Sequence, residues 1–208
     1  MTDQPYHHGK LREALLERAM ETLETSGVEG LSLRQLARDL NVSHAAPAKH
    51  FRDKQALIDA LAMAGFGIMN GRILEASQPG RDLQGRFVSV AKAYVDFALT
   101  RPALLSVMYS TKHQSDSTDE LRSIGEQGML VALALIQEGQ DAGALAEGDP
   151  GTLAMVCFSG LHGTAMLAAG KHLEGTSTEA IVKAVTDTLW AGMAAGVPAA
   201  QAAGQTVG

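Results

Sequence analysis

Residues that cross-link secreted proteins are scarce in this sequence. It has a single cysteine, Cys157, so no disulfide can form within the chain. Its first residues do not follow the basic, apolar and small-residue order of a signal peptide. These absences argue against a disulfide-rich secreted protein, and we expect a cytoplasmic one.

Signals for β-strands are also nearly absent. Aromatic residues make up only 4% of the chain, and no segment alternates cleanly between apolar and polar residues. Ala, Leu, Met, Glu and Gln, most of which favour helices, dominate instead. With 46% hydrophobic residues among 208, the chain can bury a real core and has room for two domains. We therefore expect an all-α protein of about nine helices.

The motifs of common enzymes are missing as well. There is no phosphate-binding glycine loop, Gly-x-Ser-x-Gly elbow, catalytic Cys–His spacing or His-Glu-x-x-His helix. The seven histidines include no helical pair that faces a cysteine or a carboxylate, so we expect no metal site and no cofactor. We expect no enzyme, with a site assembled from distant residues as the open alternative.

The charge of the chain is unevenly distributed. The net charge is −6, and all of it falls after residue 54, where nine Lys or Arg face fifteen Asp or Glu. Residues 1–54 are neutral, and within 31–54 five basic residues face two acidic ones. An acidic body with a small basic head suits a protein that touches nucleic acid with one end.

Apolar periodicity predicts where the helices lie. In the N-terminal part they span 9–26, 33–40, 44–51 and 54–75. Further helices are predicted at 83–100, from 102, at 119–141, 150–171 and 178–196, with a polar loop at 110–118. The tail from Pro198 has no core residues, and we expect 198–208 to be disordered.

Two of these helices are short and closely spaced. Ser32 can cap the first, and Gln35 can reach back to complete a capping box. Asn41 and Val42 form a short turn, after which Ser43 can cap the second helix. Helices of this length joined so tightly predict a helix-turn-helix.

The same segment carries a family resemblance. The residues LSLRQLARDLNVS at 31–43, followed by APAKHFRDK at 46–54, resemble the TetR family of repressors. The resemblance implies a helix-turn-helix domain at 6–54, connected by the helix 54–75 to a ligand-binding and dimerisation domain at 76–197. It implies a transcriptional repressor that binds a palindromic double-stranded DNA operator as a homodimer and is released by a small apolar or amphipathic effector.

Small side chains at the start of the second short helix can approach base edges in the major groove. His44, Ala45 and Ala46 occupy those positions, and Arg34 can reach a guanine edge. Helix N-termini and lysines suit phosphates, while His50 also has a structural interpretation at the helix junction. The candidate DNA-binding residues are Ser32, Arg34, Ser43, His44, Ala45, Ala46, Lys49, His50 and Lys54.

The body carries a second resemblance, to the WHG-type C-terminal domain of one TetR subgroup. It rests on the segment 94–109 and on Gly160-Leu161-His162-Gly163, where Leu161 replaces the usual Trp. This resemblance implies a small-molecule pocket between helices, although each pocket candidate can equally be plain core. The candidates are Phe66, Met69, Phe87, Tyr94, Phe97, Met108, Met129, Phe158 and His162.

The stretch 151–170 has no formal charge over twenty residues. A membrane span is the alternative, but Gly, Thr, Ser and His dilute its hydrophobicity, so we expect no membrane partner. Instead, this helix and the next predict an intersubunit four-helix bundle. The candidate interface residues are Leu161, Ile181, Val185, Leu189, Trp190 and Met193.

One position departs from the family pattern. Ala48 stands where relatives usually carry a Tyr that packs on the DNA backbone. The absence of this Tyr gives some support to an alternative function, a helical adaptor that has lost DNA binding.

The same departure makes a prediction. Ala48→Tyr is expected to tighten binding to non-specific duplex by roughly fivefold per subunit, because one restored backbone contact is worth about 1 kcal/mol. Fluorescence anisotropy with a labelled random duplex measures this. Unchanged affinity would mean that position 48 does not reach the DNA backbone.

Overall fold

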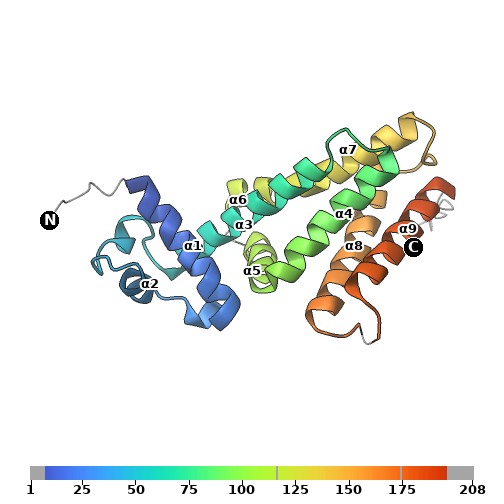
Figure 1. Ribbon diagram of the computed structural model, residues 1–208. Helices are drawn as coiled ribbons and strands as arrows, with labels where there is room; N and C mark the ends of the chain where they lie inside the picture. Colours follow the sequence, from blue (N-terminus) through green and yellow to red (C-terminus); the bar gives the residue numbers. More distant parts are fainter. Residues whose placement is uncertain (1–7, 116, 174, 196–208) are drawn as a thin grey trace, which may run out of the picture. The chain divides into compact units, whose positions relative to one another are not determined.

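The computed structural model describes residues 8–115, 117–173 and 175–195. Within these ranges the chain forms α-helices and two short 3₁₀ helices and has no strand, so the all-α fold class is confirmed (Figure 1). The predicted disorder of 198–208 concerns residues outside the described ranges.

The chain divides into two compact units. The first comprises the described residues up to Gly71 together with 96–127, and the second comprises 72–95 together with the described residues from Gly128 onward. The predicted domain limits, 6–54 and 76–197, stay predictions. The α-helices are α1 His8–Ser26, α2 Leu33–Asp39, α3 Lys54–Ala76, α4 Leu83–Thr100, α5 Pro102–Lys112, α6 Asp119–Ile124, α7 Gln127–Asp141, α8 Pro150–Ala169 and α9 Thr178–Ala195; the 3₁₀ helices are Val28–Gly30 and Pro47–Lys49.

Helix α1 is the centre of the first unit. Its residues Leu15, Ala19 and Leu23, four apart, are fully or almost fully buried, because α1 packs against both α2 and α5. Gly27 ends the helix: it adopts a φ of +64°, and its N–H donates to the Leu23 carbonyl over 2.9 Å. A left-handed residue of this kind is favourable only for glycine, so the end of α1 is fixed by local sequence.

The continuous helix predicted at 119–141 is wrong. The structure has two helices, α6 and α7, separated by a break at Gly125. The free carbonyls at the end of α6 are taken by distant side chains: Asn70 Nδ2 donates to the Ile124 carbonyl over 2.8 Å, and Lys112 Nζ to that of Gly125 over 3.1 Å. Because these donors come from α3 and α5, the periodicity of 119–141 cannot reveal the break.

The second unit has its own core. It contains Phe87 of α4, Ile136 of α7, Met193 of α9 and several residues of α8, among them Ala154 and Cys157. Leu145 can pack closely against α7 because Gly139 lacks a side chain: a Cβ at position 139 would lie 2.6 Å from Leu145 Cδ1. A larger residue at 139 would push Leu145 out of this core.

Two helices, α3 and α8, are long and apolar enough to cross a membrane, with mean hydropathies of 1.3 and 1.4. Each helix contributes side chains to a core, for example Leu61 and Phe66 from α3 and Ala154 and Ala165 from α8. Core helices of water-soluble proteins pass the same test, so length and hydropathy alone are weak evidence for a span.

The break between α6 and α7 makes a prediction. Asn70→Ala is expected to lower the free energy of unfolding by about 1 kcal/mol, because the carbonyl of half-buried Ile124 loses its donor. Urea denaturation at a fixed protein concentration measures the change. Gln127→Ala is the control: Gln127 is exposed and lies 3.4 Å from Asn70 Nδ2, so its removal is expected to cost less than about 0.5 kcal/mol. Equal losses for the two variants would contradict this account.

Candidate nucleic-acid interface

Helix α2 begins as predicted but lacks half of the predicted capping box. Ser32 is the N-cap, and its hydroxyl accepts the N–H of Gln35 over 3.4 Å. The Gln35 side chain does not reach back to Ser32; it donates to Asp39 Oδ1 over 2.6 Å and accepts from Arg38. The reciprocal contact is therefore wrong, because a partner one turn ahead on the helix takes the Gln35 side chain.

The helix predicted at 44–51 is also wrong. Residues 44–46 form turns and only Pro47–Lys49 is a 3₁₀ helix, closed by bonds from Ala46 N to Ser43 O and from Lys49 N to Ala46 O. Pro47 has no N–H to donate to the Ser43 carbonyl, so the first α-helical bond cannot form. The N-cap of the 3₁₀ helix is Ala46, which makes no side-chain cap, so the cap predicted for Ser43 is wrong too.

The turn nevertheless presents a compact exposed edge. Ser43, His44 and Ala45 are exposed in succession, whereas Pro47 and Phe51 are buried and anchor the segment. Ala48 is exposed on this segment as well. Among the other predicted DNA-binding residues, Ser32, Arg34 and Lys49 are exposed, and Ala46, His50 and Lys54 are half-buried.

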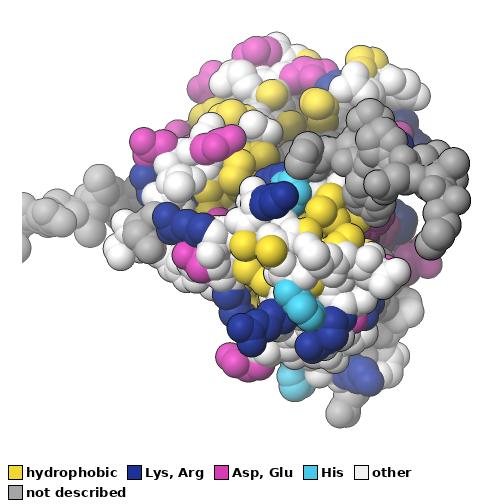
Figure 2. Space-filling model, turned by 90° about the vertical axis from the view of Figure 1, so that its left-hand side faces the viewer, with side chains coloured by type: hydrophobic (Ala, Val, Ile, Leu, Met, Phe, Trp, Pro, Cys, Tyr) yellow, Lys and Arg dark blue, Asp and Glu magenta, His cyan; other side chains and the backbone are white. Residues whose placement is uncertain are grey.

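Basic residues are frequent in the segment that contains this turn: Arg34, Arg38, Lys49, Arg52 and Lys54 lie within 31–54, against two acidic residues. Figure 2 shows the face at the left-hand side of Figure 1, and Lys, Arg and His side chains gather in its lower half. Arg12 of α1 lies over the ring of Phe51, 5.6 Å from the ring centroid. This cation–π contact links α1 to the end of the exposed turn.

An ion pair that the sequence did not reveal places α2 against α1. Arg18 Nε donates to Asp39 Oδ2 over 2.8 Å, and Arg18 Nη1 donates to Glu21 over 2.9 Å. The Arg18 hydrogen bond, with help from Gln35, holds the pKa of Asp39 below its ordinary value. The partners lie 21 residues apart, so no spacing rule marks them as a pair.

The predicted pocket residues separate into the two units. Phe66, Met69, Phe97 and Met108 are buried in the first unit, where Phe66 packs edge-on against Tyr109 with ring centroids 5.7 Å apart. The others lie in the second unit, where Phe87 packs against Trp190 and Met129 against the core cluster. Tyr94, Phe158 and His162 form a group of their own.

This second-unit group combines one hydrogen bond with ring packing. Tyr94 Oη lies 2.6 Å from His162 Nδ1, and the ring of Phe158 stacks on His162 at 5.3 Å. Tyr94 is buried and His162 half-buried, and burial lowers the pKa of His162 below its usual value. A neutral imidazole beside a phenol offers hydrogen bonding without charge in an aromatic surrounding.

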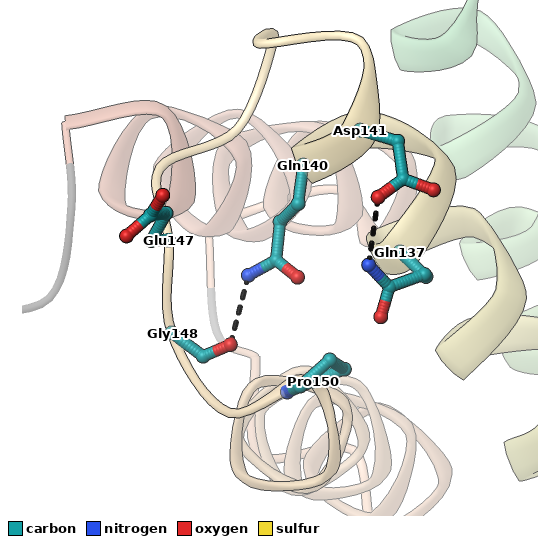
Figure 3. Close-up of a pocket in the computed structure, with 6 residues that line it drawn as sticks. All are labelled: Gln137, Gln140, Asp141, Glu147, Gly148 and Pro150. Atoms are coloured by element: carbon teal, nitrogen blue, oxygen red, sulfur yellow. Dashed lines mark hydrogen bonds between the residues drawn. The ribbon is translucent and has the colours of Figure 1, made fainter.

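A surface hollow of about 310 Å³ lies elsewhere in the second unit (Figure 3). None of the predicted pocket residues lines it. Gln140 points across it and donates to the carbonyls of Ala146 and Gly148, and Gln137 is bonded to Asp141. Some of the polar groups that line the hollow are thus hydrogen-bonded to one another. The lining residues are Gln137, Gln140, Asp141, Glu147, Gly148 and Pro150. In the described part of the chain, no three His, Cys, Asp or Glu side chains gather to hold a metal ion.

Several predicted interface residues are used within the subunit. Helices α8 and α9 pack together, and a Cβ at Gly160 would lie 3.6 Å from both Val185 and Leu189. Leu161 and Met193 are buried, and Ile181 and Trp190 are half-buried. The apolar side chains that α8 leaves exposed are different ones: Met155, Val156, Met166 and Leu167, each between 39% and 53% exposed.

Comparison with known proteins adds two family matches. Residues 15–61 match the profile of the bacterial regulatory proteins of the tetR family, and residues 87–189 match that of the tetracycline repressor-like C-terminal domain. The second match does not name the WHG subtype, which stays a prediction.

Individual relatives agree with these matches. The chain is 49% identical over 53 residues to the class C tetracycline repressor of Escherichia coli; this match spans 26% of the chain and 24% of that repressor. A solved structure of a protein of unknown function from Rhodococcus sp. RHA1 is 46% identical, with a TM-score of 0.86 over 92% of this chain and all of that one. AibR, solved with isovaleryl coenzyme A and operator DNA, shares the fold at 16% identity, with a TM-score of 0.65 over 86% of this chain and 98% of that one.

The Arg18–Asp39 pair makes a prediction about pH. Because the folded-state pKa of Asp39 lies below its ordinary 3.8, the pair stabilises α2 above about pH 4, and this contribution is lost as the pH falls through the lowered pKa. Arg18→Gln is expected to raise the pKa of Asp39 toward its ordinary value, as followed by NMR of side-chain carboxyl carbons. Glu21→Gln is the control and is expected to leave the Asp39 pKa low. An unchanged Asp39 pKa in Arg18→Gln would contradict the assignment.

Proposed function

Because the chain belongs to the tetR family of bacterial regulatory proteins, we propose that it is a cytoplasmic repressor of transcription that binds a palindromic operator as a homodimer. The observation that carries this proposal is the exposed turn Ser43-His44-Ala45, anchored by buried Pro47 and Phe51 within a segment, 31–54, of five basic and two acidic residues. A regulator of this kind needs no catalytic centre, and we propose none.

The exposed residues divide into base-reading and phosphate-binding roles. His44 and Ala45 come first on the turn and would meet base edges in the major groove, as would Arg34 at the start of α2. Lys49 and Lys54 would meet phosphates, and Ser32 would bring the N-terminus of α2 to the backbone. Ser43 and Ala46, also predicted to bind DNA, would lie near the DNA backbone because they belong to the turn.

His50 is assigned a structural role. Its ring is half-buried and packs beside Phe51, with ring centroids 6.5 Å apart. A side chain held at the junction of the turn and α3 supports the orientation of Lys49 more directly than it contacts a base. Sequence preference would thus depend on few side chains, mainly Arg34, His44 and Ala45.

The dimer would form through α8 and α9. Helix α8 contains no Asp, Glu, Lys or Arg and exposes a large apolar face through Met155, Val156, Met166 and Leu167. Helix α9 exposes mainly small residues: Ala180, Ala184, Thr188 and Ala191. Large side chains of one subunit can fit against small ones of the other in a two-fold four-helix bundle. Val185 and Leu189, predicted at this interface, would instead hold α9 on α8.

The effector would bind near Tyr94, Phe158 and His162. The neutral Tyr94–His162 pair and the stacked ring of Phe158 suit an apolar or amphipathic molecule with one polar group. AibR, which shares the fold, was solved with isovaleryl coenzyme A, a larger and highly charged molecule of which only the acyl group is apolar. The effector would release the operator only if it binds the free protein more tightly than the DNA-bound one, since coupling is reciprocal.

A DNA titration tests the repressor proposal. Duplexes selected from a random pool are labelled and titrated at two salt concentrations, with excess non-specific competitor, by fluorescence anisotropy. A competitor-resistant complex that weakens steeply with salt is expected. Lys49→Ala is expected to reduce the slope of log K against log salt by about 0.9 for each subunit, because one phosphate contact is lost.

The control variant removes one lysine charge at a position far along the chain from the exposed turn. Lys183 lies exposed on α9 and pairs with Asp187, so Lys183→Ala is expected to leave the salt slope unchanged. If no duplex is enriched from the pool, DNA binding is absent, and the adaptor alternative, to which exposed Ala48 gives some support, would replace the repressor.

A further inference from the structure

Helix α5 begins without a capping side chain of its own. Its N-cap is Arg101, which makes no side-chain cap, and its first residue is Pro102, which has no N–H. The next two amides, those of Ala103 and Leu104, therefore need an acceptor from elsewhere.

That acceptor is Glu24, near the end of α1. Its Oε2 accepts the N–H of Ala103 over 3.1 Å, and its Oε1 accepts that of Leu104 over 2.9 Å. Both carboxylate oxygens are thus used, and the negative charge lies at the positive end of the α5 dipole. Glu24 is half-buried, so water screens these bonds less than it would on an open surface.

A second contact from the same corner reaches α1 one turn earlier. Arg101 Nη1 lies 3.8 Å from Sδ of Met20, which is buried. The two contacts come from residues within the first four positions of the α5 start, 101–104, and meet adjacent turns of α1. The start of α5 is therefore fixed to α1 both along and around the helix axis.

Helix α1 also holds α2. Arg18, six residues before Glu24, binds Asp39 at the end of α2, four residues before the exposed turn begins at Ser43. A continuous set of contacts thus runs from the amides of α5 through Glu24 and α1 to the DNA-contacting turn. Each link is a hydrogen bond or ion pair within the first unit.

We propose that Glu24 is the positioning residue that couples α5 to the DNA-contacting turn. When DNA fixes the turn, α1 and Glu24 are fixed with it, and the first amides of α5 become harder to open. By reciprocity, any displacement of α5 weakens DNA binding through the same carboxylate. This inference rests on the proposed DNA-binding function and adds the route by which that function is regulated.

Hydrogen exchange of the full-length protein, read by mass spectrometry on peptides containing Ala103 and Leu104, tests the coupling. The probe is the duplex selected from the random pool, and every variant is compared free and DNA-bound. In the unmodified protein the duplex is expected to slow exchange of these amides by about fivefold, the lower end of typical coupling between sites. In Glu24→Ala this slowing is expected to vanish at saturating duplex, and exchange in the free protein to rise on the order of tenfold.

Two further variants separate coupling from folding. Glu24→Gln keeps the shape of the side chain and one accepting oxygen, so an intermediate DNA-dependent slowing is expected. Glu17→Gln neutralises an exposed carboxylate on the same helix, one that makes no hydrogen bond or ion pair to the described residues, and is expected to behave as the unmodified protein. Helix content by circular dichroism verifies that each variant is folded.

The outcomes are distinguishable. If folded Glu24→Ala or Glu24→Gln retains the full DNA-dependent slowing, the coupling does not pass through Glu24 and the inference is overturned while the repressor stands. If the unmodified protein binds no selected duplex, the proposed function fails, and the coupling fails with it.

Discussion

Burial of one side of α1 is the constraint on which the first unit depends. Leu15, Ala19 and Leu23 are covered by helices from both ends of the unit's sequence, α2 shortly after them and α5 about eighty residues later. Apolar packing of this kind has no direction, so it holds the helices together without fixing their rotation or sliding. The orientation of the exposed turn therefore depends on a second set of contacts, which are directional.

Polar side chains make these directional contacts. Arg18 binds Asp39 of α2, Glu24 binds the first amides of α5, and Asn70 donates to the carbonyl of Ile124, the last residue of α6. Glu24 and Asn70 meet helix ends, where backbone groups lack partners, whereas Arg18 pairs with a side chain at the end of α2. Hydrogen bonds and ion pairs depend on direction, so they select one arrangement among several that pack equally well.

The second unit divides its apolar residues between two tasks. The inward side of α8 and the residues of α9 that meet it form the core with Phe87 and Ile136, while the outward side of α8 stays exposed. A helix that is apolar nearly all round has no reason to stay exposed on one side in a lone subunit, which supports the proposed dimer. On the same helix, His162 meets Tyr94, and burial lowers its pKa, which places a neutral polar pair among aromatic rings.

The sequence by itself determined what depends on neighbours along the chain. Apolar periodicity predicted α1, α2 and α4, and Ser32 predicted the cap of α2, because these features rest on contacts within about four residues. It also predicted a short element after Ser43, although Pro47 converts the predicted helix into turns and a 3₁₀ helix; that this element contacts DNA stays a proposal.

Only the tertiary structure decided what depends on residues far apart in the chain. The break between α6 and α7 follows from Asn70 and Lys112, the direction of the Gln35 side chain from competition for Asp39, and the cap of α5 from Glu24. The pocket candidates, alike in the sequence as apolar residues at helical spacing, separate into a buried core and the Tyr94 group only after folding. Periodicity reports which side of a helix is apolar, and it carries no information on which distant polar group will meet that helix's end.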